Sequence, residues 1–373
     1  MDFSQMLSGP LAARRLADLG ARVIKVEPRG GEPLRRARQV VDGVDGDALR
    51  FHSYNGGKES VELDLKAEPD RQVALRLARD ADVIVQNFRQ GVMERFGLGY
   101  EQLREENPGL VYASVTGFGS EGPWSNDPGQ DLLGQARSGL LWLSGQDGGP
   151  PTTFGGLIAD IGSANILAQV ILAALVGRAR TGHGAHVETS LLEACLEFQV
   201  DSLPMFLNRG EGQPHRSKVP GGGHIYVPAP YGVFRTSDGY VALGKLPDAG
   251  LAEILGHSDF LTQAALENVD TPTWEKARDR ILEELAELFP EKCSAEWVVR
   301  ITELKGWIVE VLDWEQLAAS EGFQKLEITS SPRSDRRAVV LNAPFKIDRS
   351  RPESGPAPRR DDHGDIIRRQ GWD

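Results

Sequence analysis

Two carboxylates near the middle of the chain stand in contexts that could support chemistry. Asp131 lies in the segment DPGQDLLGQA, and Asp160 lies in the segment GGLIADIGSA. Asp160 follows two glycines and a short apolar run, and it leads into a long apolar segment with helical character. A carboxylate there is a typical N-cap or first-turn residue, because its charge complements the helix dipole. A catalytic role for Asp160 therefore needs support beyond its position in the sequence.

Two glycine-rich segments could bring backbone amides close to an anion or to an acyl oxygen. One covers residues 117–122, and the other is the run Gly221, Gly222 and Gly223. Glycine lacks a Cβ, so its backbone can approach a ligand closely. Glycine turns are common in proteins, however, and neither segment defines a site by itself.

The chain lacks the sequence motifs of several large enzyme classes. No G-x-G-x-x-G opens a helix after a strand, which disfavours a nicotinamide dehydrogenase, and no P-loop, G-x-S-x-G or H-E-x-x-H occurs. Cys195 and Cys293 lie far apart, and Gly184 between His183 and His186 disfavours a metal-binding helix face. We expect no metal site, no disulfide framework and a reducing, cytoplasmic location.

Composition and charge limit the partners of the protein. The 373 residues are 40% hydrophobic and 26% charged, as in soluble globular proteins of two or three domains. A net charge of −12 repels nucleic acid, and no run approaches about 18 apolar residues, so we expect neither nucleic acid nor membrane as a partner. Residues 1–58 nevertheless carry ten basic side chains against seven acidic ones. This surplus either forms a solvated surface or binds an anionic small ligand.

The first two hundred residues alternate between helical and strand-like patterns. This alternation predicts an α/β fold, a Rossmann-like large domain with a parallel sheet covered by helices. The expected helices cover residues 10–19, 70–80 and 159–178. The expected strands cover residues 21–27, 59–66, 81–86 and 109–116, and a further strand runs into a helix over residues 187–200.

A second, smaller α+β domain is predicted after a change of composition. Residues 203–230 are rich in Gly, Pro and basic residues and lack periodicity, which indicates a crossover linker. The linker would join a large domain of residues 1–202 to a small domain of residues 231–304. The small domain is expected to contain a hairpin over residues 231–243 and helices over residues 274–289 and 295–304. Residues 305–373 are expected to return to the large domain and complete it.

The order of several segments resembles that of the family III coenzyme A transferases. These segments, spread over residues 2–364, are SGPLAARRLADLGARVIKVE, GGEPLRR, YNGGKESVELDLK, ADVIVQNFRQGVMERFGLGYEQLREENPGLVYASVTGFGSEGP, PGQDLLGQARSGL, RTGHGAHVETSLLEA, LNAPFKI and GPAPRRDDHG. The block over residues 81–140 is the most specific of them. The resemblance implies an interlocked homodimer and no tightly bound cofactor.

The resemblance also implies acyl-CoA:carboxylate CoA transfer with Asp160 as the nucleophile. An aspartate with a reference pKa of about 3.9 is ionised at neutral pH and needs no separate base. In the implied reaction, CoA moves from an acyl-CoA donor to a carboxylic acid through aspartyl anhydrides and an aspartyl-CoA thioester. Gly221, Gly222 and Gly223 are implied to form a loop over the site, and Gln130 is implied to form the wall beside the nucleophile.

The same resemblance implies a binding site for coenzyme A, which acts as a substrate and not as a resident cofactor. Arginine and lysine suit its phosphates, whereas asparagine and backbone groups suit its pantetheine and adenine ends. This assignment gives the basic surplus of the first 58 residues a use. The implied CoA-binding residues are Met6, Leu7, Ser8, Arg35, Lys58, Asn87, Phe88 and Arg95.

Three departures from the family pattern stand out. The usual N-R-x-K is Asn55, Gly56, Gly57 and Lys58 here, so one frequent arginine is missing. The aromatic residue of P-G-Y-D is replaced by Gln130. The first strand begins only at residue 1, which is expected to weaken the edge of the sheet.

Gln130 also bears on the alternative functions. The α-methylacyl-CoA racemases of the same fold use a histidine at this position, opposite the aspartate, and an amide cannot serve as that second base. Intramolecular CoA transfer by an isomerase, and CoA binding without turnover, stay open as alternatives. The donor and acceptor acids cannot be read from the sequence, and we expect loops near residues 140–156 and 203–230 to select them.

Overall fold

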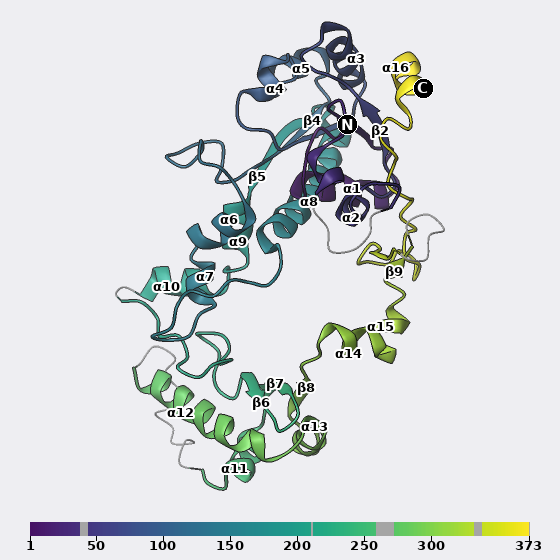
Figure 1. The fold of residues 1–373 in the computed structure, drawn as a ribbon. Helices are drawn as coiled ribbons and strands as arrows, with labels where there is room; N and C mark the ends of the chain where they lie inside the picture. The colour runs from purple at the N-terminus through teal and green to yellow at the C-terminus, as the bar shows by residue number, and fades with distance from the viewer. Residues whose placement is uncertain (38–43, 210–211, 259–271, 332–337, 373) are drawn as a thin grey trace. The chain divides into compact units, whose positions relative to one another are not determined.

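A computed structural model describes residues 1–37, 44–209, 212–258, 272–331 and 338–372 (Figure 1). The chain divides into two compact units. The first unit contains residues Met1–Ser138, Gly155–Glu197 and Leu326–Asp373, and the second contains Gly139–Phe154 and Phe198–Lys325. Each unit is described by itself below.

The first unit is built on a parallel sheet. Its strands are β1 (Ile24–Glu27), β2 (Glu59–Glu62), β3 (Val83–Gln86), β4 (Val111–Thr116) and β5 (Ala185–Ser190). Across the sheet the order is β2, β1, residues 1–3, β3, β4 and β5, with every described neighbour pair parallel. This is the strand order of doubly wound α/β folds, which bind ligands where the order reverses. The predicted parallel α/β fold is thus confirmed.

The N-terminal residues lie in the centre of this sheet and not at its edge. Asp2 pairs with Lys25 of β1 on one side and with Val85 of β3 on the other. The Phe3 amide donates to the Val85 carbonyl at 2.9 Å, and the Val26 amide donates to the Asp2 carbonyl at 2.9 Å. The expectation of a weakened sheet edge is therefore wrong, because residues 1–3 do not form an edge of the sheet. They lie between β1 and β3 and join them.

Helices cover the sheet because each presents apolar side chains at helical spacing. Buried residues that include Ile24, Leu77, Ile84 and Leu98 form one core between strands and helices. The predicted helices over residues 10–19, 70–80 and 159–178 are observed with shifted ends. The helices of this unit are α1 (Ser8–Asp18), α2 (Leu49–Asn55), α3 (Glu68–Arg79), α4 (Val92–Arg95), α5 (Tyr100–Glu106), α6 (Asp131–Arg137), α8 (Ile158–Thr181), α9 (Leu191–Glu197) and α16 (Gly364–Gln370), with a 3₁₀ turn at Pro33–Arg36.

Helix α8 is the longest apolar helix among the described residues. Its 24 residues are long and apolar enough to cross a membrane, and 39% of its most apolar stretch is buried inside the protein. It packs against α1, α9, β4 and β5 (Figure 1). The core helix of a soluble protein meets the same criterion, so this helix alone is weak evidence for a membrane location.

The second unit contains a three-stranded antiparallel sheet. Its strands are β6 (Gly232–Arg235), β7 (Tyr240–Lys245) and β8 (Trp307–Glu310), in that order across the sheet. The predicted hairpin is confirmed, since Thr236 and Gly239 close the turn between β6 and β7. The helices are α7 (Leu140–Leu143), α10 (Ser202–Arg209), α11 (Asp248–Leu255), α12 (Pro272–Leu288), α13 (Ser294–Glu303) and α14 (Trp314–Ala319), with a 3₁₀ turn at Phe289–Glu291. Helix α15 (Glu321–Leu326) ends this stretch, and strands β9 (Thr329–Ser330) and β10 (Val340–Leu341) form an antiparallel pair in the first unit.

The boundaries of the units differ from the predicted domains. Residues 139–154 join the second unit because the Arg216 side chain donates to the Trp142 carbonyl at 2.8 Å and the Asp147 amide donates to the Ser217 carbonyl at 2.8 Å. Strand β8 was expected within the return segment of residues 305–373. It instead pairs with β7 and buries Ile308 in the small core. The linker predicted over residues 203–230 also lies in the second unit, and its residues 210–211 are outside the described residues.

The core of the second unit is centred on one aromatic side chain. Phe289 is fully buried, stacks on Phe234 with ring centroids 4.9 Å apart and contacts Trp297 at 4.6 Å. The Trp297 indole donates to the Phe289 carbonyl at 2.7 Å. Through these contacts Phe289 packs between Trp297 of α13 and Phe234 of β6.

We predict that Phe289→Ala lowers the free energy of unfolding of the second unit by about 3–5 kcal/mol, because it leaves a cavity in this core. Urea unfolding followed by far-UV circular dichroism measures the loss. Val299→Ala, on the exposed side of α13, is the matched control and should change it by less than about 0.5 kcal/mol. Equal midpoints for the two variants would contradict this account of the core.

Candidate active site

The loop of residues 4–8 lies where the strand order of the parallel sheet reverses. It follows the short central strand, and Asn87 follows the neighbouring strand β3. The Gln5 amide donates to Asn87 Oδ1 at 2.8 Å, and Asn87 Nδ2 donates to the Gln5 carbonyl at 2.8 Å. These two bonds tie the carboxyl ends of both strands together. The sheet thus places the loop at the position where doubly wound folds bind ligands.

Buried polar groups of the sheet also hold the loop of residues 4–8. The Ser4 amide donates to Asp2 Oδ1 at 2.9 Å, and Lys25 Nζ donates to the Ser4 carbonyl at 2.9 Å. Gly9 lies so close to Ser4 that an added Cβ would stand 2.3 Å from the Ser4 Cβ. Only glycine fits there, so α1 begins directly against the loop. The result is a rigid entry into α1.

Three residues from three helices meet at the start of α8. Asp160 lies in the first turn of α8, where its amide has no partner within the helix, and this amide donates to Asp131 Oδ1 of α6 at 3.0 Å. The Ser8 hydroxyl at the start of α1 donates to Asp160 Oδ1 at 2.5 Å. Asp131 in turn accepts from Gln135 Nε2 at 2.6 Å. The Asp160 carboxylate is therefore fixed through both its backbone and its side chain.

The surroundings of Asp160 act on its pKa in opposite directions. Burial raises the pKa of Asp160 above its ordinary value, and the nearby charge of Asp131 raises it further. The hydrogen bond from Ser8 lowers it. A carboxylate that has lost part of its hydration is a stronger nucleophile than one in water.

Cys195 is a second potential nucleophile near this cluster, since its thiol interacts electrostatically with Asp131 and Asp160. It is buried in α9, and burial raises the pKa of its thiol to about 11. The thiol is therefore neutral at pH 7, and a neutral thiol is a poor nucleophile. The Asp160 carboxyl is the better candidate, because the ordinary pKa of an aspartate lies far below that of a thiol.

Two predicted phosphate ligands are buried in ion pairs. Lys58 Nζ lies 2.8 Å from Asp2 Oδ2 and donates to the Pro10 carbonyl at 2.8 Å, and burial lowers its pKa to about 8. Arg35 forms a bidentate pair with Glu27, with distances of 2.6 and 2.7 Å. The positive charges of Lys58 and Arg35 are therefore balanced by buried carboxylates. Four of the ten basic side chains in the first 58 residues are buried, namely Arg14, Lys25, Arg35 and Lys58. Four others are exposed, namely Arg22, Arg29, Arg36 and Arg50.

The remaining predicted site residues fall into three groups. Met6 is exposed with a positive φ of 69°, while Leu7 is buried and caps α1. Phe88 packs partly buried against the core of the first unit, and its amide donates to the Gln86 side chain at 2.8 Å. Arg95 is exposed at the end of α4. These positions are compatible with a ligand at the carboxyl ends of the strands.

The residues predicted to surround the nucleophile are placed differently from one another. Gln130 is exposed and directly precedes Asp131 at the start of α6, in the first unit with Asp160. Gly221, Gly222 and Gly223 lie in the second unit, where the Gly221 carbonyl accepts from the Val233 amide at 2.8 Å. Their role over Asp160 therefore stays a prediction.

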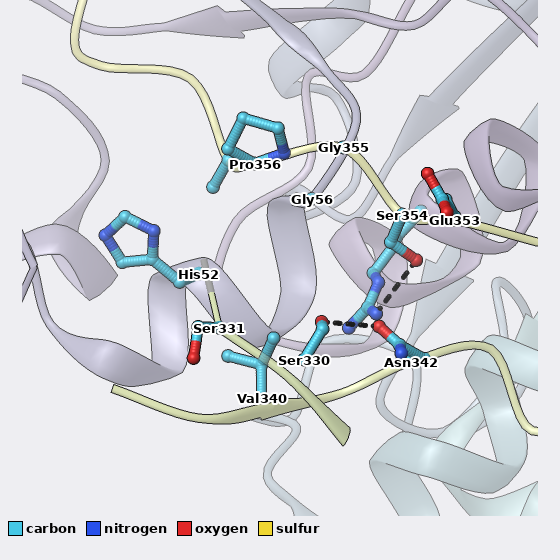
Figure 2. Close-up of a pocket in the computed structure, with 12 residues that line it drawn as sticks. His52, Gly56, Ser330, Ser331, Val340, Asn342, Glu353, Ser354, Gly355 and Pro356 are labelled. Atoms are coloured by element: carbon cyan, nitrogen blue, oxygen red, sulfur yellow. Dashed lines mark hydrogen bonds between the residues drawn. The ribbon is translucent and has the colours of Figure 1, made fainter. Parts of the chain in front are cut away.

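A separate cavity of about 270 Å³ lies between the C-terminal tail and helices α1 and α2 (Figure 2). Arg14, whose side chain lines it, donates to the Leu341 carbonyl at 2.7 Å and to Ser354 Oγ at 3.3 Å. A Cβ on Gly56 would stand 2.9 Å from the Gly355 carbonyl oxygen. The glycine pair that replaces the family's N-R-x-K arginine thus lets the tail pack closely. Asp160 does not line this cavity, and we assign it no role in the reaction.

Sequence reasoning missed the contacts that define the site. Asp131 was singled out as a carboxylate, but its bond to the Asp160 amide joins residues 29 positions apart and leaves no local signal. Ser8 was assigned to CoA alone, whereas its hydroxyl contacts the predicted nucleophile.

Comparisons with known proteins identify the family of this chain. The pattern of CoA-transferase family III matches residues 1–364. A succinyl-CoA:mesaconate CoA-transferase of Haloarcula hispanica is 32% identical over 97% of this chain and 92% of its own. An acetyl-CoA:oxalate CoA-transferase of Acetobacter aceti is 41% identical over 64% of this chain and 60% of its own.

Solved structures of similar proteins share the fold. The crystal structure of Rv3272 from Mycobacterium tuberculosis matches with a TM-score of 0.82 and 31% identity, covering 98% of this chain and 96% of that one. A CaiB/BaiF family protein from Brucella suis matches with a TM-score of 0.82 and 27% identity, covering 99% and 97%. The chain belongs to CoA-transferase family III, and it is a CoA-transferase.

Proposed function

We propose that the protein moves CoA from an acyl-CoA donor to a free carboxylic acid through covalent intermediates on Asp160. The observation that carries this proposal is the half-buried Asp160 carboxylate, fixed by Ser8 and Asp131 beside the point where the strand order reverses. Burial strips water from this carboxylate, which favours attack and protects the intermediates from hydrolysis.

The reaction needs four acyl transfers. Asp160 attacks the thioester carbonyl of the donor, and CoA leaves as a thiolate, which gives a mixed anhydride. The thiolate attacks the Asp160 carbonyl and releases the donor acid, which gives an aspartyl-CoA thioester. The acceptor carboxylate attacks this thioester to form a second anhydride, and the thiolate then attacks the acceptor carbonyl. Asp160 is regenerated as a carboxylate, so no external base is needed.

The substrates are proposed to be short dicarboxylic acids and their CoA thioesters. The relative aligned over 97% of this chain is named for succinyl-CoA and mesaconate, and the one at 41% identity is named for acetyl-CoA and oxalate. The loops expected to select the acid lie near residues 140–156 and 203–230. Residues 140–154 and the described part of 203–230 belong to the second unit, where the Arg216 side chain donates to the Trp142 carbonyl. We also propose that the enzyme works in the cytoplasm.

Racemisation is the weaker alternative. A two-base proton exchange requires a second base opposite Asp160, and the amide of Gln130 cannot accept a proton in that role. Intramolecular transfer within one acid would use the same intermediates and is distinguished by its products.

We predict that Asp160→Ala abolishes transfer from succinyl-CoA to a panel of dicarboxylic and hydroxy acids, because it removes the carboxylate on which the anhydride is proposed to form. Product acyl-CoA thioesters are measured by mass spectrometry. Incubation of the wild type with donor, followed by hydroxylamine, should modify the peptide that contains Asp160. Ser163→Ala, one turn later in α8, is the control and should retain transfer. Substantial turnover by Asp160→Ala would reject the mechanism.

The phosphates of CoA are proposed to contact Arg95 and other exposed cations of the first unit. Arg35 and Lys58 belong to the predicted set, but their ion pairs with Glu27 and Asp2 support a structural role. The two roles make different predictions, since a phosphate ligand affects affinity and a buried ion pair affects stability.

We predict that Arg95→Ala weakens CoA binding by about 1.5–3 kcal/mol, through the loss of a charge-assisted hydrogen bond, and that binding weakens as salt rises. Lys58→Ala should instead lower the free energy of unfolding by about 3–5 kcal/mol, because it removes the closer of the two cations that contact the buried Asp2 carboxylate. Calorimetry and urea unfolding measure the two effects. Arg180→Ala, at the far end of α8, is the control for both. A Lys58→Ala protein of normal stability that fails to bind CoA would reverse the assignment.

The active protein is proposed to be a homodimer of interlocked chains. The chain passes between the units near residues 138, 155, 197 and 326, which suits threading around a second copy. One face of the β6–β7–β8 sheet exposes apolar side chains that a second copy would cover, namely Val233, Tyr240, Trp307 and Val309. Exposed apolar patches of this kind mark protein interfaces.

We predict that tagged and untagged protein, mixed under native conditions, fail to exchange subunits over hours. Interlocked chains separate only after partial unfolding. Affinity capture of the tag followed by mass spectrometry measures exchange, and light scattering on dilution measures the mass. Mixed dimers formed within minutes, or a monomer at nanomolar concentration, would contradict the interlocked dimer.

A further inference from the structure

We propose that Ser8 is a catalytic residue, whose hydroxyl binds one oxygen of Asp160 throughout the reaction and leaves the other oxygen to attack. This inference rests on the proposed function of Asp160 as the nucleophile. It gives Ser8 a role in the bond-making steps, which differs from the CoA contact that the sequence implied.

The geometry that carries the inference is the hydrogen bond between the starts of two helices. Ser8 Oγ donates to Asp160 Oδ1 at 2.5 Å, and the Ser8 side chain is buried with only 4% of the residue exposed. Asp160 itself is half-buried. The donor is therefore shielded from water while the carboxylate keeps an accessible side.

Several polar contacts hold the backbone around Ser8 in place. Lys58 binds the carbonyl of Pro10 in the first turn of α1, and Asn87 binds both backbone groups of Gln5. The close approach of Gly9 to Ser4 fixes the turn between them. A donor held this firmly loses little freedom when it binds a reacting oxygen, which is the condition for electrostatic preorganisation.

The chemistry assigns different tasks to the two oxygens of Asp160. Oδ2 forms the bond to the donor carbonyl carbon as the carbon–sulfur bond breaks, while Oδ1 becomes the carbonyl oxygen of the anhydride. When the CoA thiolate attacks Cγ of Asp160, negative charge develops on Oδ1, and it returns to the carbonyl as the bond between Cγ and Oδ2 breaks. The same charge develops when the acceptor attacks the thioester. Ser8 donates to Oδ1 in both steps, so its bond is strongest in the transition states.

The charged and titratable groups that face Asp160 define the expected pH behaviour. Among the residues that the structure describes, they are Asp131 on α6, Cys195 on α9 and Tyr54 on α2, and none of these three is a cation. The hydrogen bond from Ser8 therefore opposes both burial and the charge of Asp131. Without it the pKa of Asp160 rises. Because the nucleophile must be ionised, activity would then be lost at a higher pH as the solution is acidified.

The test compares Ser8→Ala and Ser8→Thr with the wild type, using succinyl-CoA as donor and a dicarboxylic acid accepted by the wild type. For Ser8→Ala we expect kcat to fall about 10- to 100-fold, the loss of one hydrogen bond to a charged group, with the KM for donor little changed. The acid limb of the pH profile should move to higher pH. Ser8→Thr keeps the hydroxyl and should restore both. Ser163→Ala, which removes a hydroxyl that donates to the backbone carbonyl of Asp160 and not to its carboxylate, should leave the pH profile unchanged.

Other outcomes reject the inference in separable ways. A normal kcat and pH profile for Ser8→Ala, or a raised KM with a normal kcat, would show that Ser8 is not catalytic. If Asp160→Ala is inactive in the same experiment, Asp160 is still supported as the nucleophile. Transfer by Asp160→Ala would reject the proposed function itself. If Ser8→Ala does not fold, Ser8→Cys keeps the side-chain size with a weak donor, and the same fall in kcat and shift in pH are expected.

Discussion

The hydrogen bond between Ser8 and Asp160 joins the starts of α1 and α8 on the same side of the parallel sheet, and the chemistry of the site depends on it. Each helix contributes through its amino end, where the helix dipole favours negative charge. Burial and the carboxylate of Asp131 act against that charge. The Ser8 hydroxyl is therefore the side-chain group that favours the ionised form of the nucleophile, against the effects of burial and of the Asp131 charge.

The loop that carries Ser8 is positioned by charges inside the first unit. The side chains of Asp2, Lys25 and Lys58 are fully buried, and Asp2 Oδ2 lies 3.7 Å from Lys25 Nζ and 2.8 Å from Lys58 Nζ. Lys58 also donates to the Pro10 carbonyl in α1. Buried ion pairs rarely add net stability, since desolvation cancels much of their attraction. Their value here is specificity, because each cation also binds a backbone carbonyl that fixes the path of residues 4–10.

Most helices and strands of the fold, and the family, could be predicted from the sequence, but the contacts between the site residues could not. Apolar periodicity located α3 and α8, and Asp238-Gly239 located the hairpin of the second unit. Residues 1–3 carry too few positions to show a strand pattern, so their place between β1 and β3 could not be read. Lysine and arginine near a ligand loop suggested phosphates, yet Lys58 and Arg35 are used inside the fold. Whether a basic residue binds a ligand or a buried carboxylate depends on contacts between residues far apart in the sequence. Composition does not predict these contacts.

The most direct test of the account follows oxygen atoms through one turnover. If the acceptor acid carries ¹⁸O in its carboxylate, the final step leaves one of those oxygens on Asp160 and the other in the new acyl-CoA. After a single turnover, mass spectrometry of the digested enzyme should show a gain of one ¹⁸O in the peptide that contains Asp160. Formation of the labelled acyl-CoA with no ¹⁸O in that peptide would contradict nucleophilic catalysis by Asp160.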